Sequence, residues 1–298
     1  MTAEAGQLQR LLLIAQNPDG GWAYQQPGTS WTEPSALALL ALAAQNNTGP
    51  AYTRGRSWLL QTQKADGGWA PAPAVDTSTC MTSVAVLALA DGALKTPALA
   101  RGVRWLLDQE NGETPALERV ALRLLGAAPP KAPGGSPWFP GTAAWIAPTA
   151  MSVLALGRAA RAGVASAADE QRLRPAIKRA QQYLLSRTCR DGGWNHGGSS
   201  FRSEDAESYP ETTGLALLAL QGVSPAELQR PFRRAESFLV APQPVEALSW
   251  LQLALTRHGR TLQLANSRPV CRNTRDICLR LLALADPGKD TFGEASMS

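Results

Sequence analysis

The sequence predicts an all-α protein in which about six helix pairs form an α/α toroid of two concentric rings. Two observations lead to this fold class. The tetrapeptide DGGW occurs three times in the same context, and the predicted helices around it alternate between amphipathic and uniformly apolar. A helix that is apolar on every side is a buried helix, so the apolar helices are best packed as an inner ring. An open solenoid of helix pairs is the competing architecture, but it does not require inner helices that are apolar all round.

The three clear copies define the repeat. DGGW at residues 19–22, 66–69 and 191–194 follows a helix with leucine and aromatic residues at three- and four-residue steps. These predicted outer helices cover Leu8–Gln16, Arg54–Gln63 and Ile177–Arg187, and the inner helices that follow cover Pro34–Ala44, Thr79–Ala90 and Glu211–Leu220. Proline beside Ser, Thr or Glu marks several inner-helix starts, as is typical of helix N-termini.

Weaker copies continue the pattern along the chain. Gly102–Gly112 keeps the outer helix, and Gly134–Leu156 parallels Gly20–Leu42. Further helices are predicted at Pro225–Val240, Pro244–Arg257 and Asn273–Ala285. We therefore expect one toroid domain over residues 1–285 and a polar, frayed tail over 286–298. Which helices pair between Glu113 and Pro148 stays open, because the proline-rich segment Pro129–Pro140 replaces an outer helix. The choice between six and seven helix pairs stays open as well.

Composition excludes several classes of protein. With 298 residues, 44% hydrophobic and 18% charged, the chain can bury a full core. Its basic residues are scattered, so we expect no nucleic-acid partner. The longest uncharged stretch, Ala132–Gly157, is interrupted by four prolines, so no transmembrane segment is expected. The chain enters a helical pattern almost at once, which leaves no room for a signal peptide and predicts a cytoplasmic protein.

The unit around the second copy resembles a known repeat. Aromatic-Leu-Leu-x-x-Gln-x-x-Asp-Gly-Gly-Trp, which runs from Trp58 to Trp69, resembles the QW repeat of squalene and oxidosqualene cyclases. The related repeat of protein prenyltransferase β subunits is similar. The resemblance implies that Trp22, Trp69 and Trp194 are structural, and that the site lies where the inner-helix N-termini converge on a central cavity.

Asp76 is the first candidate for chemistry, because it lies just before a predicted inner helix. Class II terpene cyclases carry a proton-donating Asp at a comparable place, so the resemblance implies that Asp76 protonates an alkene or epoxide while aromatic faces stabilise the cations. Ala74 and Thr77, however, stand where the cyclase motif has further acids. Judged by its residue type alone, Asp76 is equally suited to cap a helix that begins at Thr77.

The same segment is also similar to the zinc-binding V-D-T-C-Y motif of protein prenyltransferases. There an Asp and a Cys bind zinc together with a distant His. In this chain Ser78 stands at the place of that Cys, Cys80 is displaced by two residues, and the only histidines are His196 and His258. A zinc site needs three converging protein ligands. We therefore expect no metal and no cofactor.

Other inner-helix starts supply further candidates. Glu33 and Glu211 occupy equivalent positions and join Asp76 as candidate catalytic carboxylates, with Glu246 at a third helix start, although helix-dipole compensation accounts for each singly. The aromatic residues outside the DGGW turns are the candidate substrate-binding residues: Trp31, Trp145, Tyr209 and Trp250. The polar loop Asn195–Tyr209 suits either a flap over the mouth or a solvated excursion.

The first functional hypothesis is a terpene-cyclase-like protein that binds a polyprenyl or triterpenoid substrate, with Asp76 starting a proton-initiated cyclisation. A non-catalytic toroid that binds a lipid or a protein is the second, and a prenyltransferase-like subunit that needs a partner is a variant of the first. A carbohydrate enzyme that uses Glu33 and Glu211 is the third. Enzymatic activity, a partner subunit and peripheral membrane contact are left open.

Overall fold

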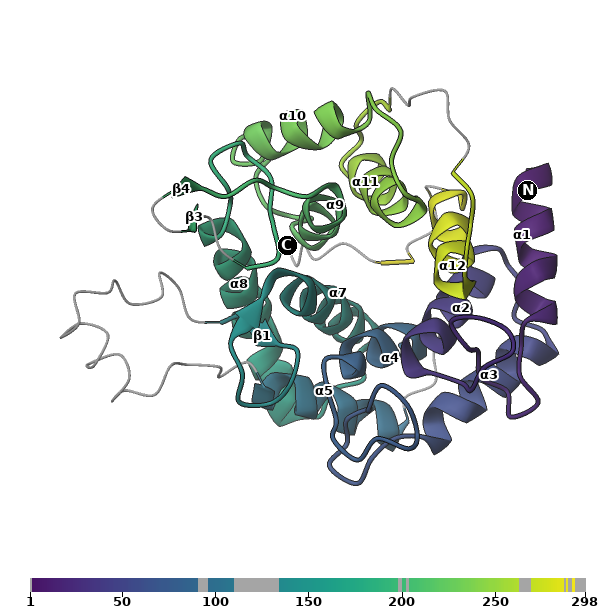
Figure 1. Ribbon diagram of the computed structural model, residues 1–298. Helices are drawn as coiled ribbons and strands as arrows, with labels where there is room; N and C mark the ends of the chain where they lie inside the picture. Colours follow the sequence, from purple (N-terminus) through teal and green to yellow (C-terminus); the bar gives the residue numbers. More distant parts are fainter. Residues whose placement is uncertain are drawn as a thin grey trace.

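The structure is a computed structural model that describes residues 2–90, 96–109, 134–197, 200–201, 204–262, 269–286, 288 and 291–292, without the side chains of residues 200–205. Within these residues, six helices form an inner ring: α2 (Thr32–Ala44), α4 (Met81–Leu89), α7 (Ile146–Ala162), α9 (Pro210–Ala219), α11 (Val245–Arg257) and α12 (Thr274–Ala283). Each packs against the next, and α12 packs against α2, so the ring is closed (Figure 1). The predicted α/α toroid is confirmed.

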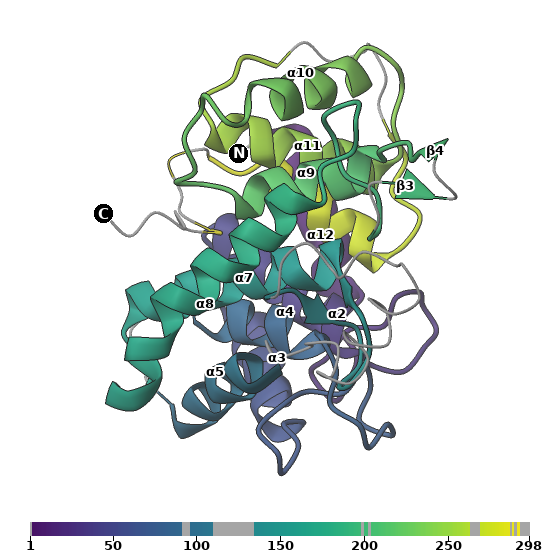
Figure 2. The ribbon, with the colours of Figure 1, turned by 90° about the vertical axis from the view of Figure 1, so that its left-hand side faces the viewer.

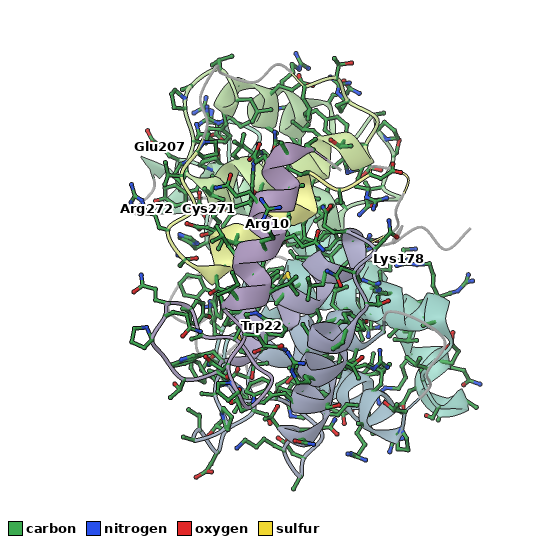
Figure 3. All side chains as sticks on the ribbon, turned by 90° about the vertical axis from the view of Figure 1, so that its right-hand side faces the viewer. Arg10, Trp22, Lys178, Glu207, Cys271 and Arg272 are labelled. Atoms are coloured by element: carbon green, nitrogen blue, oxygen red, sulfur yellow. The ribbon has the colours of Figure 1, made fainter. Side chains whose placement is uncertain are left out.

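Five described helices cover this ring from outside: α1 (Ala3–Ile14), α3 (Pro50–Gln61), α5 (Pro97–Gln109), α8 (Ala167–Ser186) and α10 (Gln229–Phe238). The last four pack against α2, α4, α7 and α9, in that order. Helix α1 instead crosses α12, the last inner helix (Figure 3). An ion pair of 2.7 Å between Arg280 and Glu4 and a hydrogen bond of 2.8 Å from Gln45 to the Leu281 carbonyl close this seam. The two ends of the repeat array are thereby joined.

The inner helices are buried because their sequences present no polar face. In α2 every residue from Ala36 to Leu42 is at most 2% exposed. Burying one leucine side chain stabilises a fold by about 1.5–3 kcal/mol, so this ring carries much of the stability. The alanines between the leucines leave room for two neighbours and an outer helix to approach closely.

Each DGGW turn ties three helices together. The Trp69 indole donates to the Leu59 carbonyl of α3 at 2.7 Å, and its amide donates to the Thr82 hydroxyl of α4 at 2.8 Å. The Asp66 carboxylate accepts from the indole of Trp105, on α5, at 3.0 Å. Two glycines are required, because Gly67 has a φ of +90° and a Cβ at Gly68 would lie 2.6 Å from Ser78.

The same contacts recur in the first copy. The Trp22 indole donates to Leu12, its amide donates to Ser35, and Trp58 donates to Asp19. In Figure 3, Trp22 lies at the C-terminal end of α1. The repeat detected in the sequence is therefore a repeated hydrogen-bond arrangement.

Two short antiparallel pairs are the described strands: β1 (Ser136–Pro137) with β2 (Ala144–Trp145), and β3 (Ser200–Phe201) with β4 (Glu204–Asp205). They lie in the connections that lead into α7 and α9 (Figure 2). No helix among the described residues is both long and apolar enough to span a membrane. Glu113 and part of the proline-rich segment lie outside the described residues.

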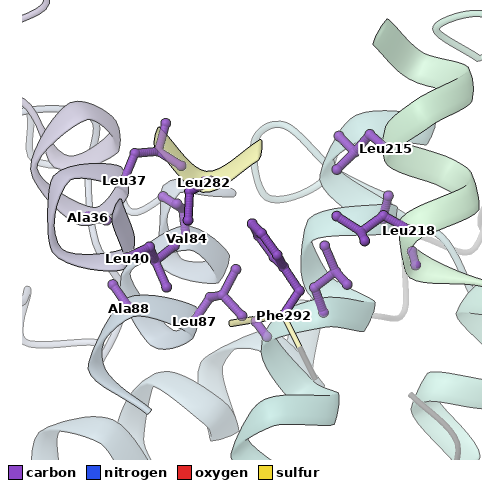
Figure 4. Close-up of a cluster of buried hydrophobic side chains, with 14 of the residues drawn as sticks. Ala36, Leu37, Leu40, Val84, Leu87, Ala88, Leu215, Leu218, Leu282 and Phe292 are labelled. Atoms are coloured by element: carbon purple, nitrogen blue, oxygen red, sulfur yellow. The ribbon is translucent and has the colours of Figure 1, made fainter. Parts of the chain in front are cut away.

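The described residues depart from two expectations about local structure. The inner helix predicted from Thr79 begins at Met81, because the Thr79 amide donates to the Trp69 carbonyl at 2.9 Å and keeps this backbone extended. The tail was expected to fray, but Thr291 and Phe292 are 8% and 1% exposed. These residues are buried because the phenyl group of Phe292 packs into the apolar centre of the inner ring of helices (Figure 4).

Candidate functional site

The N-terminal halves of the six inner helices surround a cavity of about 60 Å³. Its lining residues are Glu33, Leu37, Cys80, Met81, Ser83, Val84, Trp138, Ala147, Pro148, Met151, Leu215, Trp250 and Arg275. A water molecule needs at least about 10–15 Å³ measured in this way, so the cavity holds a few waters as it stands. A long ligand enters only when side chains move.

The walls of this cavity are apolar apart from Ser83, whose hydroxyl donates to the Cys80 carbonyl, and one polar corner. Aliphatic side chains and methionines from different helices line most of it, and two indoles complete it. Trp250 is 3% exposed, whereas Trp138 is 39% exposed. Such walls exclude water, and indole faces attract positive charge.

The polar corner is an ion-paired cluster at the start of three inner helices. Arg275 Nε lies 2.8 Å from Glu33 Oε1, and Arg275 Nη2 donates to Glu246 Oε1 at 2.7 Å. The Tyr24 hydroxyl donates to the other oxygen of Glu33. An Arg at a helix N-terminus opposes the helix dipole, and here two carboxylates compensate for it.

The charges of this cluster follow from burial and proximity. Burial alone would lower the pKa of Arg275, but Glu33 and Glu246 raise it above its ordinary value. Burial, and then the Glu33 charge, raise the pKa of Tyr24 and bring that of the Cys80 thiol to about 12. At neutral pH Arg275 therefore carries its positive charge, and Cys80 is a neutral thiol of low reactivity.

The structure brings together some of the predicted carboxylates. Glu33 lines the cavity, and Arg275 links it to Glu246. Glu211 lies in the first turn of α9, half-buried, and does not line the cavity. Only one of the two equivalent positions singled out in the sequence therefore reaches the site.

Asp76 lies in an exposed loop between Trp69 and α4 and does not line the cavity. The alternative of a helix cap is wrong, since α4 begins at Met81 with Cys80 as its N-cap residue. Its role as a proton donor stays a prediction.

Of the predicted aromatic residues, Trp250 lines the cavity. Trp31, Trp145 and Tyr209 are the N-cap residues of α2, α7 and α9, exposed by 36%, 41% and 43%. They surround the mouth end without reaching into the cavity. The polar loop that contains Tyr209 lies partly outside the described residues.

Sequence reasoning missed Arg275 and Trp138, and it considered Cys80 only as a zinc ligand. Arg275 could have been predicted from the sequence, because it is the second residue of α12, as Glu33 and Glu246 are the second residues of α2 and α11. A charged residue at this shared position is the signal. The sequence holds no such signal for Trp138, since this residue lies in the loop between β1 and β2.

The residues considered for zinc do not converge. Cys80 lines the cavity, His196 stacks on Tyr209 at 5.1 Å between ring centroids, and His258 bonds to the Leu217 carbonyl at the far end of α11. Within the described part of the chain, no group of three or more His, Cys, Asp or Glu side chains is placed to hold a metal ion.

No protein-family model matches the sequence, and no curated protein is similar to it. Solved structures share its fold. The type II terpene cyclase MstE from Scytonema, in a variant bound to geranylgeranyl dihydroxybenzoate, is 17% identical over 94% of this chain and 79% of its own, with a TM-score of 0.52. A reducing-end-xylose releasing exo-oligoxylanase is 11% identical over 95% of this chain and 92% of its own, with a TM-score of 0.54.

A glycosidase variant is 10% identical over 95% of this chain and 97% of its own, with a TM-score of 0.59. The protein thus has a terpenoid-cyclase-like α/α toroid fold, which glycosidases share. Because one fold serves both chemistries, function has to be argued from the site.

Proposed function

We propose that this protein binds a polyprenyl or triterpenoid chain in the central cavity, as a terpene-cyclase-like protein. The observation that carries the proposal is a cavity with apolar and indole walls and a single polar corner. Each methylene group that leaves water for such walls contributes about 0.8 kcal/mol. The MstE complex with a geranylgeranyl compound supports the same ligand class.

The polar corner fixes the orientation of the ligand. Arg275, a donor, and Glu33, an acceptor, line the cavity, and Glu246 and Tyr24 hold them in place from behind. A hydroxyl, epoxide or carboxyl end of an isoprenoid would bond there while the hydrocarbon chain extends between the inner helices.

A proton-initiated cyclisation needs an acid that gives a proton to the alkene and a base that takes one from the final carbocation. Asp76 is the acid proposed from the sequence, but an exposed carboxyl is surrounded by water, which takes up the proton more readily than an alkene does. Glu33, a carboxylate held by Arg275 and Tyr24, suits the base: it accepts the proton of a C–H bond whose electrons form the new alkene.

The test is incubation of the purified protein with squalene, oxidosqualene, farnesyl diphosphate and geranylgeranyl diphosphate, followed by gas chromatography with mass spectrometry. A cyclised product that disappears in Glu33→Gln is expected. Glu211→Gln is the matched control, because it makes the same change at the same helix position outside the cavity. Equal product loss in Glu211→Gln, or a Glu33→Gln variant that keeps its product, would contradict the assignment. Loss in Asp76→Asn would support the acid hypothesis.

Binding without catalysis is the second candidate, and one observation favours it. Glu33 is the carboxyl among the described cavity-lining residues, and it is engaged in an ion pair with Arg275 instead of facing the cavity as a free acid. Ligand binding by calorimetry without turnover of any substrate would support this candidate. The reported structures give no support for a partner subunit, and the apolar walls disfavour a glycan.

A further inference from the structure

The end of the chain enters the ring from the side opposite the cavity mouth. Thr291 lines a second cavity of about 60 Å³, together with residues from the C-terminal ends of α11 and α12. The mouth lies at the N-terminal ends of the same helices. Arg158, a buried residue of α7, donates to the Thr291 carbonyl and holds this segment in place.

Phe292 lines neither cavity itself, but it follows Thr291 of the second cavity and contacts Trp250 of the first. Its ring packs edge-on against Trp250, with 6.0 Å between ring centroids, and Trp250 lines the mouth cavity. Figure 4 shows the ring among leucines of the inner helices, including Leu87 and Leu215, and Leu215 also lines the mouth cavity. The space below the mouth cavity is thus filled by a side chain from outside the helical repeats.

We propose that Phe292 sets the depth of the ligand cavity and thereby limits the length of the chain that the protein binds. The inference rests on the proposed function, since it concerns the isoprenoid chain in that cavity. The inner helices are each held by a neighbouring helix on both sides. Phe292 also lies in the apolar core but belongs to the C-terminal tail, so it can be changed without altering the ring of helices. Removing its ring leaves a space that extends the cavity toward the base, which a longer chain can occupy.

The experiment measures affinities of geraniol, farnesol and geranylgeraniol for the wild type, Phe292→Ala and Phe292→Leu by isothermal titration calorimetry. Each newly buried methylene is worth roughly a factor of four in affinity. Phe292→Ala should therefore bind geranylgeraniol at least about tenfold more tightly than the wild type does, with geraniol unchanged. Phe292→Leu, which keeps more apolar volume, should show a smaller gain.

Phe232→Ala is the matched control. Phe232 is 2% exposed and packs edge-on against His258, with 5.0 Å between ring centroids. It lies on outer helix α10, and its partner His258, unlike Trp250, lines neither cavity. The same truncation there should leave the preference for chain length unchanged. An equal gain in this control would overturn the inference, because general loosening would then account for it.

The remaining outcomes separate the inference from the proposed function. Binding by the wild type with the same length preference in both Phe292 variants overturns the inference alone. No binding of any alcohol by wild type or variants overturns both. Circular dichroism checks the fold of each variant, and if Phe292→Ala does not fold, the length preference of Phe292→Leu decides by the same criterion.

Discussion

The DGGW turns and the mouth of the ring use the same repeats in opposite ways. At the turns, equivalent residues make equivalent contacts: the indoles of Trp22 and Trp69 both donate to a leucine carbonyl of the preceding helix. At the mouth, the second residue varies among the inner helices: it is Glu in α2, α9 and α11 but Arg in α12. Glu33 and Arg275 form an ion pair because they differ. Repetition builds the ring, and divergence at one position builds the site.

Burial explains why the two regions differ. Trp22, Trp69 and Trp194 are completely buried. The indole N–H of each donates to a backbone carbonyl, which would lose this donor if the tryptophan were replaced. At the mouth, Glu33 and Arg275 are each 22% exposed. Because water reaches both side chains, substituting either one costs less free energy of unfolding than substituting a fully buried residue. The following predictions test this contrast, from the largest expected effect to the smallest.

Trp69→Ala should destabilise the protein by about 3–5 kcal/mol, because it removes a completely buried indole and leaves the Leu59 carbonyl without its donor. Urea unfolding measures the loss. Trp31→Ala, at a mouth position that is 36% exposed, should cost less than about 1 kcal/mol. Equal losses in the two variants would abolish the distinction between turn and mouth.

Arg275→Gln should cost about 1–3 kcal/mol, because it leaves Glu33 and Glu246 facing each other without the cation between them. The cost is below that of a fully buried pair, since water reaches the cluster. Adding Glu33→Gln to this variant should restore part of the stability. A double-mutant cycle by urea unfolding checks this, and strictly additive losses would show that the two residues do not interact.

Acid should weaken the second DGGW turn through Asp66. Burial alone would raise the pKa of Asp66, but hydrogen bonds from the Gly68 amide, Ser78 and Trp105 together hold it below its ordinary value. A lowered folded-state pKa gives stability that is present above the unfolded value, near pH 4, and is lost as the pH falls through the folded value. Asp66→Asn should lower stability at pH 7 by about 1 kcal/mol and reduce the further loss on acidification.

Urea midpoints at pH 7, 5, 4 and 3 measure this effect. Asp76→Asn is the control, because it makes the same change in an exposed loop outside the turns. A pH profile that Asp66→Asn leaves unchanged would show that the turn carboxylate does not stabilise the fold.

The smallest effect is expected for Glu211→Gln. Glu211 shares its helix position with Glu33 but is half-buried away from the cavity, so the change in stability should stay within about 0.5 kcal/mol. Affinity for isoprenoid alcohols, measured by calorimetry, should be unchanged. A loss as large as that of Glu33→Gln would place the site around both helices.

The sequence anticipated part of the site. Glu33 and Trp250 were candidates and line the cavity, since helix starts and their equivalent positions can be read from the repeat. Asp76 was chosen by analogy, and the extended backbone up to Thr79 leaves it in an exposed loop. Trp138 could not be anticipated, because irregular loops carry no periodicity from which a direction could be inferred.

The sequence by itself determined the helices and their arrangement in two rings, because periodicity and burial are local: a helix without a polar face has to be surrounded. Only the tertiary structure decided which residues meet. Glu33 and Arg275 are 242 positions apart, and closure of the ring brings them within 2.8 Å. Phe292 likewise belongs to a polar segment, and it is buried because the closed ring leaves an apolar space at its centre that a phenyl ring fills.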